Sequence, residues 1–217
     1  MNLVFPRLYA IIDPTLLAIS ELELAEALAG SGVELIQYRN KRASSRQFFE
    51  ISRHLSSVLG PRGVRFIVND RADIAMLAGA GGVHVGQEDL GVEDARAICG
   101  GFDGKDRWVG VSTHTLEQLA AADRTSADYI AFGPIFPTAT KKNPDPVVGT
   151  ELLRRARQMT KKPLVAIGGI TLERAAEVYG AGADSLAVIR DLICAPNPGA
   201  RAREYLAVAA SAAGRGA

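Results

Sequence analysis

The sequence has few cysteines, almost no net charge and no long apolar run, and each shortage excludes a class of protein. Cys99 and Cys194 are its two cysteines, and they have neither metal-site spacing nor a partner nearby in the sequence. They predict two reduced thiols of a cytoplasmic protein and argue against a disulfide framework. Lysine plus arginine number 25 against 24 aspartate plus glutamate, a balance that offers no basic surface to nucleic acid or an anionic membrane.

No apolar stretch approaches the roughly 20 residues that span a bilayer. The first residues, MNLVFPRLYAIIDP, lack a basic region before the apolar run and a small-residue cleavage site, which argues against a signal peptide. With 217 residues, 47% of them apolar, the chain suits one soluble globular domain over residues 1–217 and is short for two. We expect its tail, residues 211–217, to fray.

Eight short β-branched segments alternate with longer segments of helical periodicity. The eight strand-like segments are 7–13, 33–39, 64–70, 82–90, 107–113, 127–136, 162–169 and 184–192. Strands that alternate with helices predict a parallel sheet buried on both faces. Eight such units predict its closure into a single (β/α)8 TIM barrel. An open doubly wound sheet is the alternative, and the count of eight disfavours it.

Polar side chains collect at the carboxyl ends of these segments, where the active sites of such barrels lie. In chain order they are Asp13, Gln37, Arg39, Lys41, Asn69, Asp70, Gln87, Glu88, Asp89, Ser112, His114, Thr138, Thr140, Lys141 and Arg190. The opposite loops are short and rich in glycine. This asymmetry predicts an enzyme with its site at one rim of the barrel.

Three cations and two carboxylates of this rim predict a metal-assisted site for an anionic substrate. We expect Arg39, Lys41 and Lys141 to converge there with Asp70 and Asp89. Mg²⁺ prefers one or two carboxylates together with phosphate oxygens and water, and no His/Cys set has the spacing of a zinc site. The alternative is that Arg39–Asp70 or Lys41–Asp89 pairs merely close the rim.

Two further segments predict phosphate binding. In AIGGIT, residues 166–171, two glycines precede Thr171 at a helix start, so backbone N–H groups are free to hold a phosphate; a tight turn is the plainer interpretation. In FGPIFPTATKKNPDP, residues 132–146, hydroxyls and ammonium groups stand in a proline-stiffened loop, which an ordinary solvated loop would also explain. Together with the metal site, these segments suggest two phosphorylated small-molecule substrates.

The three histidines have separate interpretations. His54 is expected on a solvated helix face, and His84, inside the fourth strand, is more typical of a hydrogen-bonded interior residue than of a base. His114 fits a ligand contact or a helix cap equally well. No Ser-His-Asp triad and no cysteine with a base is evident.

At this point the motifs resemble those of the thiamine-phosphate synthase family, from about Leu8 to Leu192. The matching motifs are IQYRNK, IVNDRADIA, GVHVGQEDL, VGVSTH, DYIAFGPIFPTATK and VAIGGIT, in the order and spacing of the family. The resemblance implies a transferase that joins 4-amino-5-hydroxymethyl-2-methylpyrimidine diphosphate to 4-methyl-5-(2-hydroxyethyl)thiazole phosphate. It implies Mg²⁺ as cofactor and pyrophosphate as the second product.

The resemblance also implies a role for each matching residue. Gln37 would hold the pyrimidine, Ser112 would lie near the reacting centre, and Asp70 and Asp89 would hold Mg²⁺. The diphosphate would be bound by Arg39, Lys41, Asn69 and Lys141. The thiazole phosphate would be bound by Thr138, Thr140 and the backbone at Gly169, Ile189 and Arg190.

The chain departs from the family pattern at three positions. Asn40 stands where a glutamate is usual, Gly81 where an aspartate is usual, and Arg190 where a phosphate-contacting serine is usual. Two other functions compete with the synthase. A related thiazole tautomerase would carry a catalytic histidine at the position of Pro134, and a non-catalytic sensor would have lost a ligand of the metal or diphosphate. The Ala-rich last helix is a candidate surface for a homo-oligomer.

Overall fold

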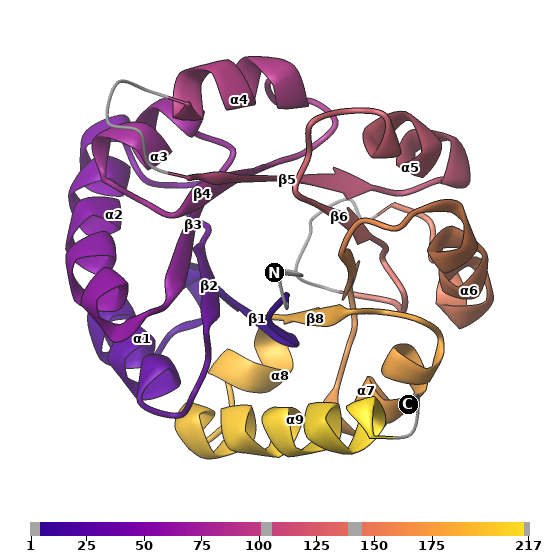
Figure 1. Cartoon of the computed structure of the whole chain (residues 1–217). Coiled ribbons are helices and arrows are strands. Elements are labelled where there is room, and N and C mark those ends of the chain that lie inside the picture. The colour runs from indigo at the N-terminus through magenta and orange to yellow at the C-terminus, as the bar shows by residue number, and fades with distance from the viewer. Residues whose placement is uncertain (1–4, 101–105, 139–144, 215–217) are drawn as a thin grey trace.

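Eight parallel strands close into a barrel in the order β1 to β8, with β8 hydrogen-bonded back to β1 (Figure 1). This computed structural model describes residues 5–100, 106–138 and 145–214. The strands are β1 Leu8–Ile12, β2 Leu35–Tyr38, β3 Arg65–Asn69, β4 Gly82–Val85, β5 Trp108–Thr113, β6 Tyr129–Phe132, β7 Leu164–Ile167 and β8 Ser185–Val188. The predicted (β/α)8 barrel is confirmed, and the open sheet is excluded.

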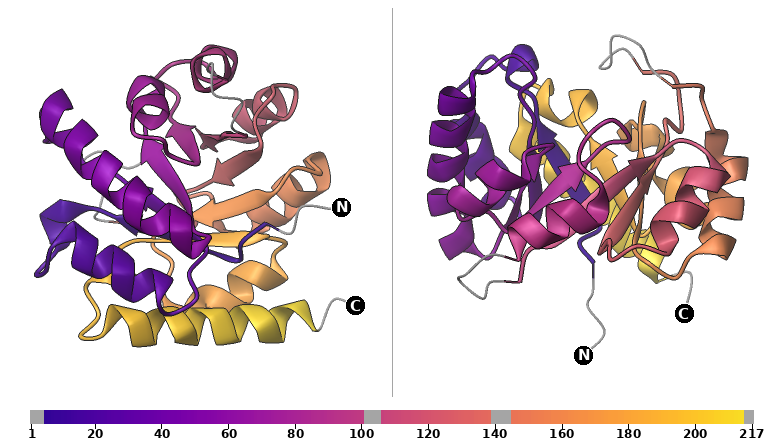
Figure 2. Two further views of the ribbon diagram at one scale, coloured as in Figure 1. Left: turned by 60° about the vertical axis from the view of Figure 1, so that its left-hand side comes forward. Right: turned by 90° about the horizontal axis from the view of Figure 1, so that it is seen from above.

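Helices follow the strands and enclose the barrel, as two further views show (Figure 2). They are α1 Glu21–Ala29, α2 Ser45–Leu59, α3 Ala72–Leu77, α4 Val92–Cys99, α5 Leu116–Asp123, α6 Gly149–Met159, α7 Leu172–Gly180, α8 Arg190–Ile193 and α9 Pro198–Ala213, with short 3₁₀ turns η1 Pro14–Leu16 and η2 Gly60–Arg62. The last helix, α9, packs against α7 and α1 on the outside of the barrel. It runs to Ala213, and residues 215–217 lie outside the described residues, so the fraying expected over residues 211–217 stays a prediction.

Local sequence signals explain where the helices begin. Ser20 caps α1 and Glu23 bonds back to the Ser20 N–H, while Ser44 and Gln47 form the same reciprocal pair at the start of α2. Each pair satisfies backbone N–H groups that the first helical turn leaves without partners. Asn197 caps α9, which has proline at its first position. Within the described residues, none of the helices has both the length and the apolar character to cross a membrane.

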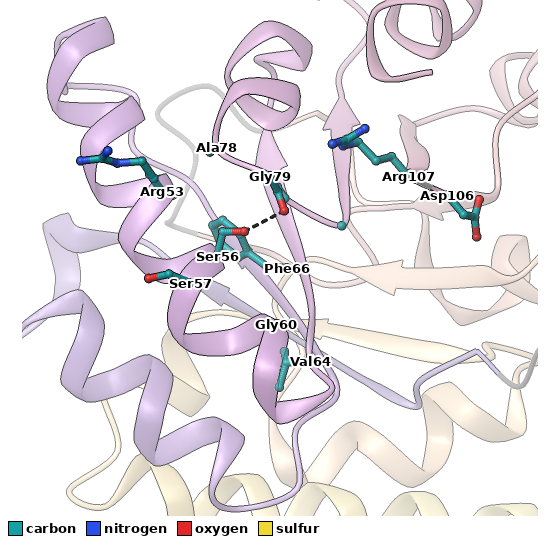
Figure 3. A pocket seen from close by; sticks show the side chains of 12 residues that line it. Arg53, Ser56, Ser57, Gly60, Val64, Phe66, Ala78, Gly79, Asp106 and Arg107 are labelled. Atoms are coloured by element: carbon teal, nitrogen blue, oxygen red, sulfur yellow. Dashed lines mark hydrogen bonds between the residues drawn. The ribbon is translucent and has the colours of Figure 1, made fainter. Parts of the chain in front are cut away.

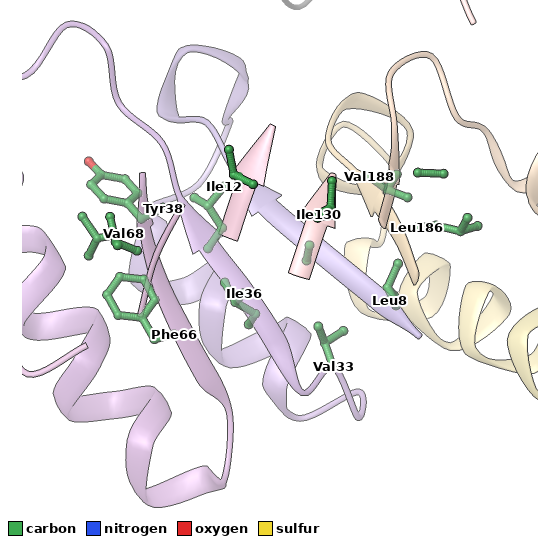
Figure 4. Close-up of a cluster of buried hydrophobic side chains, with 14 of the residues drawn as sticks. Leu8, Ile12, Val33, Ile36, Tyr38, Phe66, Val68, Ile130, Leu186 and Val188 are labelled. Carbon is green, nitrogen blue, oxygen red and sulfur yellow. The ribbon is translucent and has the colours of Figure 1, made fainter. Parts of the chain in front are cut away.

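Strand alternation divides the core into two layers. Side chains that point outward, such as Ile36, Phe66 and Leu186, pack under the helices in a large apolar cluster (Figure 4). Side chains that point inward form a second cluster in the barrel interior, which includes Tyr9 and Tyr129. Because successive residues of a strand face opposite sides, each strand supplies both layers, and no strand exposes a face to solvent.

Gly110 of β5 makes room for the ring of Tyr129 in the barrel interior. The two residues are paired in register across β5 and β6. A Cβ added at Gly110 would lie 2.0 Å from Cζ of Tyr129. Tyr129 also contacts the rings of Phe5, Tyr9 and His84. The ring is therefore fixed from several sides, and residue 110 must lack a side chain.

We predict that Gly110→Ala lowers the free energy of unfolding by about 2 kcal/mol, because the interior cannot absorb the added methyl group without displacing Tyr129. Urea denaturation followed by circular dichroism measures the loss. Gly60→Ala is the matched control, since Gly60 has helical backbone angles and an added Cβ there meets nothing within 4 Å. We expect that substitution to be neutral or slightly stabilising. Equal stability of both variants would contradict the packing argument.

Candidate active site

A cavity of about 790 Å³ lies at the carboxyl ends of the strands. Its wall contains every predicted site residue that the structure describes: Gln37, Arg39, Lys41, Asn69, Asp70, Asp89, Ser112, Thr138, Gly169, Ile189 and Arg190. Thr140 and Lys141 belong to the same prediction but lie outside the described residues. The chain thus brings side chains from all parts of its sequence to one pocket at the expected rim.

The floor of this pocket is made of inward-facing polar side chains at the carboxyl ends of neighbouring strands. Gln37 of β2, Asn69 of β3 and His84 of β4 are all buried, and Ser112 of β5 lies beside them. The register pairs Asn69 with His84. The interior position predicted for His84 is confirmed.

Hydrogen bonds link this floor across the barrel. Nε2 of Gln37 donates to the hydroxyl of Tyr9 at 2.7 Å, and the hydroxyls of Tyr9 and Tyr129 lie 2.8 Å apart. Nδ1 of His84 lies 3.1 Å from the Tyr129 hydroxyl, and Nε2 of His84 lies 2.8 Å from Oγ of Ser112. The hydroxyls and the imidazole thus satisfy one another inside the barrel, where water is scarce.

Burial keeps the groups of the floor neutral. It lowers the pKa of His84 to about 4, against a smaller raising effect of Asp89. Burial also raises the pKa of both Tyr9 and Tyr129 above the ordinary range of a phenol. At neutral pH the floor therefore offers directed hydrogen bonds but no charge.

Two carboxylates, Asp70 and Asp89, meet at one side of the pocket. Asp70 has a left-handed backbone, with φ of 64°, and its N–H donates to the carbonyl of His84 at 2.7 Å. Oδ2 of Asp89 accepts from the N–H of Gly86 at 2.7 Å. Burial raises the pKa of Asp70 and the neighbouring Asp89 raises it further, while Lys41 opposes them. A left-handed backbone at a non-glycine residue is a cost that functional sites commonly carry.

Asp70 and Asp89 fit a magnesium ion better than a zinc ion. The repulsion between the two carboxylates leaves an excess of negative charge that a divalent cation would neutralise. Over the described residues, no group of three or more His, Cys, Asp or Glu side chains gathers at one point. Mg²⁺ needs only one or two carboxylates when water and phosphate oxygens complete its shell.

Two cations of the pocket, Arg39 and Lys41, form ion pairs, but not the rim pairs considered from the sequence. Arg39 binds Asp13 at 2.8 Å instead of Asp70, and Lys41 binds Asp70 instead of Asp89. The register explains the first pair: Ile12 is opposite Tyr38, so the next residues of β1 and β2 meet at the strand ends. Asp13 also accepts from the hydroxyl of Thr15, which orients its carboxylate.

A glycine turn after β7 lies on the far side of the pocket. Gly168 and Gly169 have φ of 98° and 64°, and a Cβ on Gly169 would lie 2.5 Å from the carbonyl oxygen of Pro137. In the described part of the chain, the N–H groups of Gly169 and Arg190 have no protein acceptor. The exposed side chain of Arg190 and that of Arg174 stand at the same wall. Free N–H groups beside guanidinium groups can bind a phosphate.

His114 joins the wall of the pocket to the end of β6. Its Nδ1–H donates to the carbonyl of Gly133 at 2.6 Å, and its Nε2 lies 3.4 Å from Oδ2 of Asp145. The cap of α5 is Thr115, so the helix-cap interpretation of His114 is wrong. His54 is exposed on α2, as expected.

A smaller cavity of about 440 Å³ lies away from this pocket (Figure 3). Its lining includes Arg53, Ser56 and Gly79, and the hydroxyl of Ser56 donates to the Gly79 carbonyl at 2.8 Å. None of the predicted site residues lines it. The clustering of carboxylates, cations and free N–H groups distinguishes the larger pocket as the candidate active site.

The comparisons with known proteins agree with this geometry. The sequence family described as thiamine monophosphate synthase matches residues 8–192. The chain belongs to that family. The matched span includes all eight strands and every predicted site residue.

Relatives of the chain carry matching names. It is similar to the thiamine-phosphate synthase of Koribacter versatilis, with 49% identity over 214 residues that cover 95% of this chain and 97% of the relative. It is 39% identical over 199 residues to the thiamine-phosphate synthase of Methanospirillum hungatei, covering 91% and 95% of the two chains. Among solved structures, thiamine phosphate pyrophosphorylase from Pyrococcus furiosus has a TM-score of 0.85 and 32% identity, over 95% of this chain and 96% of that one.

Among the residues that sequence reasoning missed, two line the pocket and one lies beneath its floor. Tyr9 lies within an apolar strand and lines the floor, Tyr129 joins the hydrogen bonds beneath it, and Arg174 lies on α7 with its guanidinium 4.4 Å from the ring centre of Phe136. For the tyrosines a signal existed, because the alternation that points Ile36 outward points Tyr9 and Tyr129 inward. For Arg174, a helix-surface interpretation was equally consistent with the sequence.

We predict that Asp70→Asn stabilises the metal-free protein at pH 7. The raised pKa of Asp70 means that the folded state disfavours its ionised form, so stability is lost as the pH rises through that pKa. Asparagine also tolerates a left-handed backbone. The gain in urea midpoint should shrink as the pH falls toward 3.8, the ordinary value for aspartate.

Asp73→Asn is the matched control for this experiment. A hydrogen bond from Arg71 lowers the pKa of Asp73, so removing that carboxylate should cost a little stability at pH 7, the opposite sign. A loss of stability in Asp70→Asn at pH 7 would mean that the attraction of Lys41 outweighs burial and Asp89.

Proposed function

We propose that the chain is a thiamine-phosphate synthase, a transferase that joins a pyrimidine diphosphate to a thiazole phosphate with release of pyrophosphate. The observation that carries the proposal is the single pocket in which a carboxylate pair, cations and a glycine turn with free N–H groups meet. The carboxylate pair and the cations suit a metal-bound diphosphate, and the glycine turn suits a second phosphate.

The proposed chemistry exchanges one bond for another at the exocyclic carbon of the pyrimidine. The carbon–oxygen bond breaks with its electron pair on the departing pyrophosphate, and the thiazole nitrogen then donates its lone pair to the carbocation-like carbon. The aminopyrimidine ring stabilises that cation, so no protein nucleophile or strong base is required. The pocket fits this requirement, since its floor is neutral and its charges lie at the rim.

The roles follow the positions of the residues. Gln37 and Ser112 would contact the pyrimidine and the reacting centre, and Arg39, Lys41 and Asn69 would bind the diphosphate. Asp70 and Asp89 would hold Mg²⁺, which neutralises the leaving charge when bound. Fixed positive charge lowers the barrier because it requires no reorganisation as the pyrophosphate departs. Lys141 is proposed for the same task.

The thiazole phosphate would bind at the opposite wall. Thr138 and the backbone at Gly169, Ile189 and Arg190 line that wall, and Thr140 is proposed to join them.

Pro134, in the position where the tautomerase would carry its histidine, lines the same pocket, which favours the synthase over the tautomerase. The described cations and carboxylates are present, so the sensor is disfavoured as well. Two cysteines that form no disulfide, Cys99 and Cys194, accord with the proposed cytoplasmic location.

The proposal predicts that thiamine phosphate and pyrophosphate appear together when purified protein receives both substrates and Mg²⁺. Omitting either substrate or chelating the metal should abolish both products. Asp89→Asn should lower turnover by about 100-fold or more, because it removes charge that serves the departing pyrophosphate. Chromatography of the products measures each rate.

Asp94→Asn is the control for Asp89→Asn, because Asp94 is an exposed carboxylate on α4 away from the pocket. We expect it to retain normal turnover. Both variants should remain folded, with cooperative melting curves. Near-normal turnover in folded Asp89→Asn would remove Asp89 from the metal site, and absence of product from the folded parent would contradict the proposed function.

We predict that Arg190→Ser raises the KM for the thiazole phosphate by less than about tenfold, since the backbone N–H of residue 190 remains in place. Steady-state kinetics with saturating pyrimidine diphosphate measures it. A larger loss, confined to KM, would show that the guanidinium is itself a phosphate ligand.

A further inference from the structure

We propose that Tyr9, Tyr129 and His84 are positioning residues that form one directional chain of hydrogen bonds from Gln37 to Ser112. This hydrogen-bond chain fixes which atoms of Gln37 and Ser112 donate to the substrate and which accept from it. The identity of that substrate rests on the proposed function, whereas the chain of hydrogen bonds does not.

The hydrogen-bond chain is continuous, and all its members except the half-buried Ser112 are buried. Its four contacts measure 2.7, 2.8, 3.1 and 2.8 Å from Gln37 through the two tyrosines and His84 to Ser112. Tyr9, Gln37 and Tyr129 are at most 2% exposed, and His84 is 6% exposed. Because water cannot supply other partners at such burial, each hydroxyl must use the neighbours that the chain provides.

The donors and acceptors along the chain have one consistent order. Nε2–H of Gln37 donates to the Tyr9 oxygen, so the Tyr9 proton goes to Tyr129, and the Tyr129 proton goes to Nδ1 of His84. A neutral imidazole carries a single proton, which must then be on Nε2. It donates to Oγ of Ser112 and leaves the Ser112 proton directed to the pocket.

The reverse order requires a different side chain at the start. If Ser112 donated to Nε2 of His84, Nδ1–H of His84 would donate to Tyr129, and Tyr129 would donate to Tyr9. The Tyr9 proton would then need a different acceptor. Only the amide oxygen of Gln37 could serve, which requires the amide to turn over. The orientation of the Gln37 amide therefore decides whether the Ser112 hydroxyl donates to His84 or to the pocket.

This coupling has a consequence for recognition. In the proposed order, Gln37 keeps Oε1 and its second N–H for the pocket, an acceptor beside a donor. That pair is complementary to a ring nitrogen next to an amino group, as in an aminopyrimidine. At the other end, Ser112 offers a donor to a developing anion. A turned amide would present its donor and its acceptor to the wrong atoms of the ring, and the Ser112 hydroxyl would donate to His84 instead of to the substrate. Mismatched buried polar groups weaken binding strongly.

The packing around this hydrogen-bond chain allows each tyrosine hydroxyl to be removed by a single Tyr→Phe substitution. The Tyr129 ring lies against Gly110 and contacts Phe5, Trp108 and His84. Phenylalanine would keep those contacts and lose only the hydroxyl. Tyr179→Phe is the matched control, since Tyr179 is also a buried tyrosine. Its hydroxyl donates to the Arg7 carbonyl at 2.7 Å and takes no part in the hydrogen bonds from Gln37 to Ser112.

The first test reads the His84 tautomer without any need for activity. Protein with ¹⁵N-labelled histidine has three imidazoles, and a His84→Asn variant assigns the signal. Long-range ¹H–¹⁵N correlation at pH 7 should show the His84 proton on Nε2. Tyr129→Phe should shift the population toward the other tautomer, and Tyr179→Phe should leave it unchanged. A proton on Nδ1 in the parent, or no change in Tyr129→Phe, would overturn the proposal.

The second test separates positioning from general support of the fold. Calorimetry measures the binding of the pyrimidine diphosphate and of an analogue that lacks the ring amino group. The parent should prefer the amino compound, and Tyr129→Phe and Tyr9→Phe should each reduce that preference by about tenfold. Tyr179→Phe should preserve it. Equal weakening of both compounds in Tyr129→Phe would show a structural role alone and overturn the proposal.

The two tests also keep this proposal distinct from the proposed function. A parent protein that makes no thiamine phosphate would remove the function and leave the tautomer result standing. A parent that makes product but carries the His84 proton on Nδ1 would keep the function and remove the directional chain.

Discussion

The hydrogen bond between the hydroxyls of Tyr9 and Tyr129, 2.8 Å long, crosses the interior of the barrel, and the floor of the pocket depends on it. It exists because Tyr9 of β1 and Tyr129 of β6 both face inward, and the ring of Tyr129 lies over Gly110 of β5. With that contact in place, Gln37, His84 and Ser112 have partners for buried polar atoms that would otherwise cost several kcal/mol between them. The barrel interior is therefore apolar below and hydrogen-bonded above, and the polar layer faces the pocket.

Charge is kept off this floor and concentrated at the rim. Arg39 is held by Asp13, Lys41 by Asp70, and Asp70 shares its surroundings with Asp89. This arrangement is unfavourable for the empty protein, because a half-buried carboxylate pair and a left-handed Asp70 both cost stability. A bound cation and an anionic substrate would reverse that cost, which is the usual relation between a strained site and its ligand.

The wall of the pocket proposed for the second phosphate offers backbone N–H groups as well as side chains. Gly169 is in contact with the segment that carries Pro137, so the turn after β7 and the loop after β6 form one surface. Arg174 stacks on Phe136 within the same surface. The N–H groups of Gly169 and Arg190, which have no acceptor in the described part of the chain, line the same pocket, and they are the reason for proposing a second phosphate there.

The sequence by itself determined the fold and the list of residues at the rim. Eight alternations of β-branched and helical segments predict the closed barrel, and the strand ends of such a barrel identify Gln37, Asp70 and Asp89. The sequence suffices for this because the hydrophobic period of each segment and the order of the segments can be read along the chain. Only the tertiary structure decided the partners: Asp13 for Arg39, Asp70 for Lys41, and two tyrosines between Gln37 and His84. Partners depend on strand register and on the space left by Gly110, and both are set when distant segments pack together.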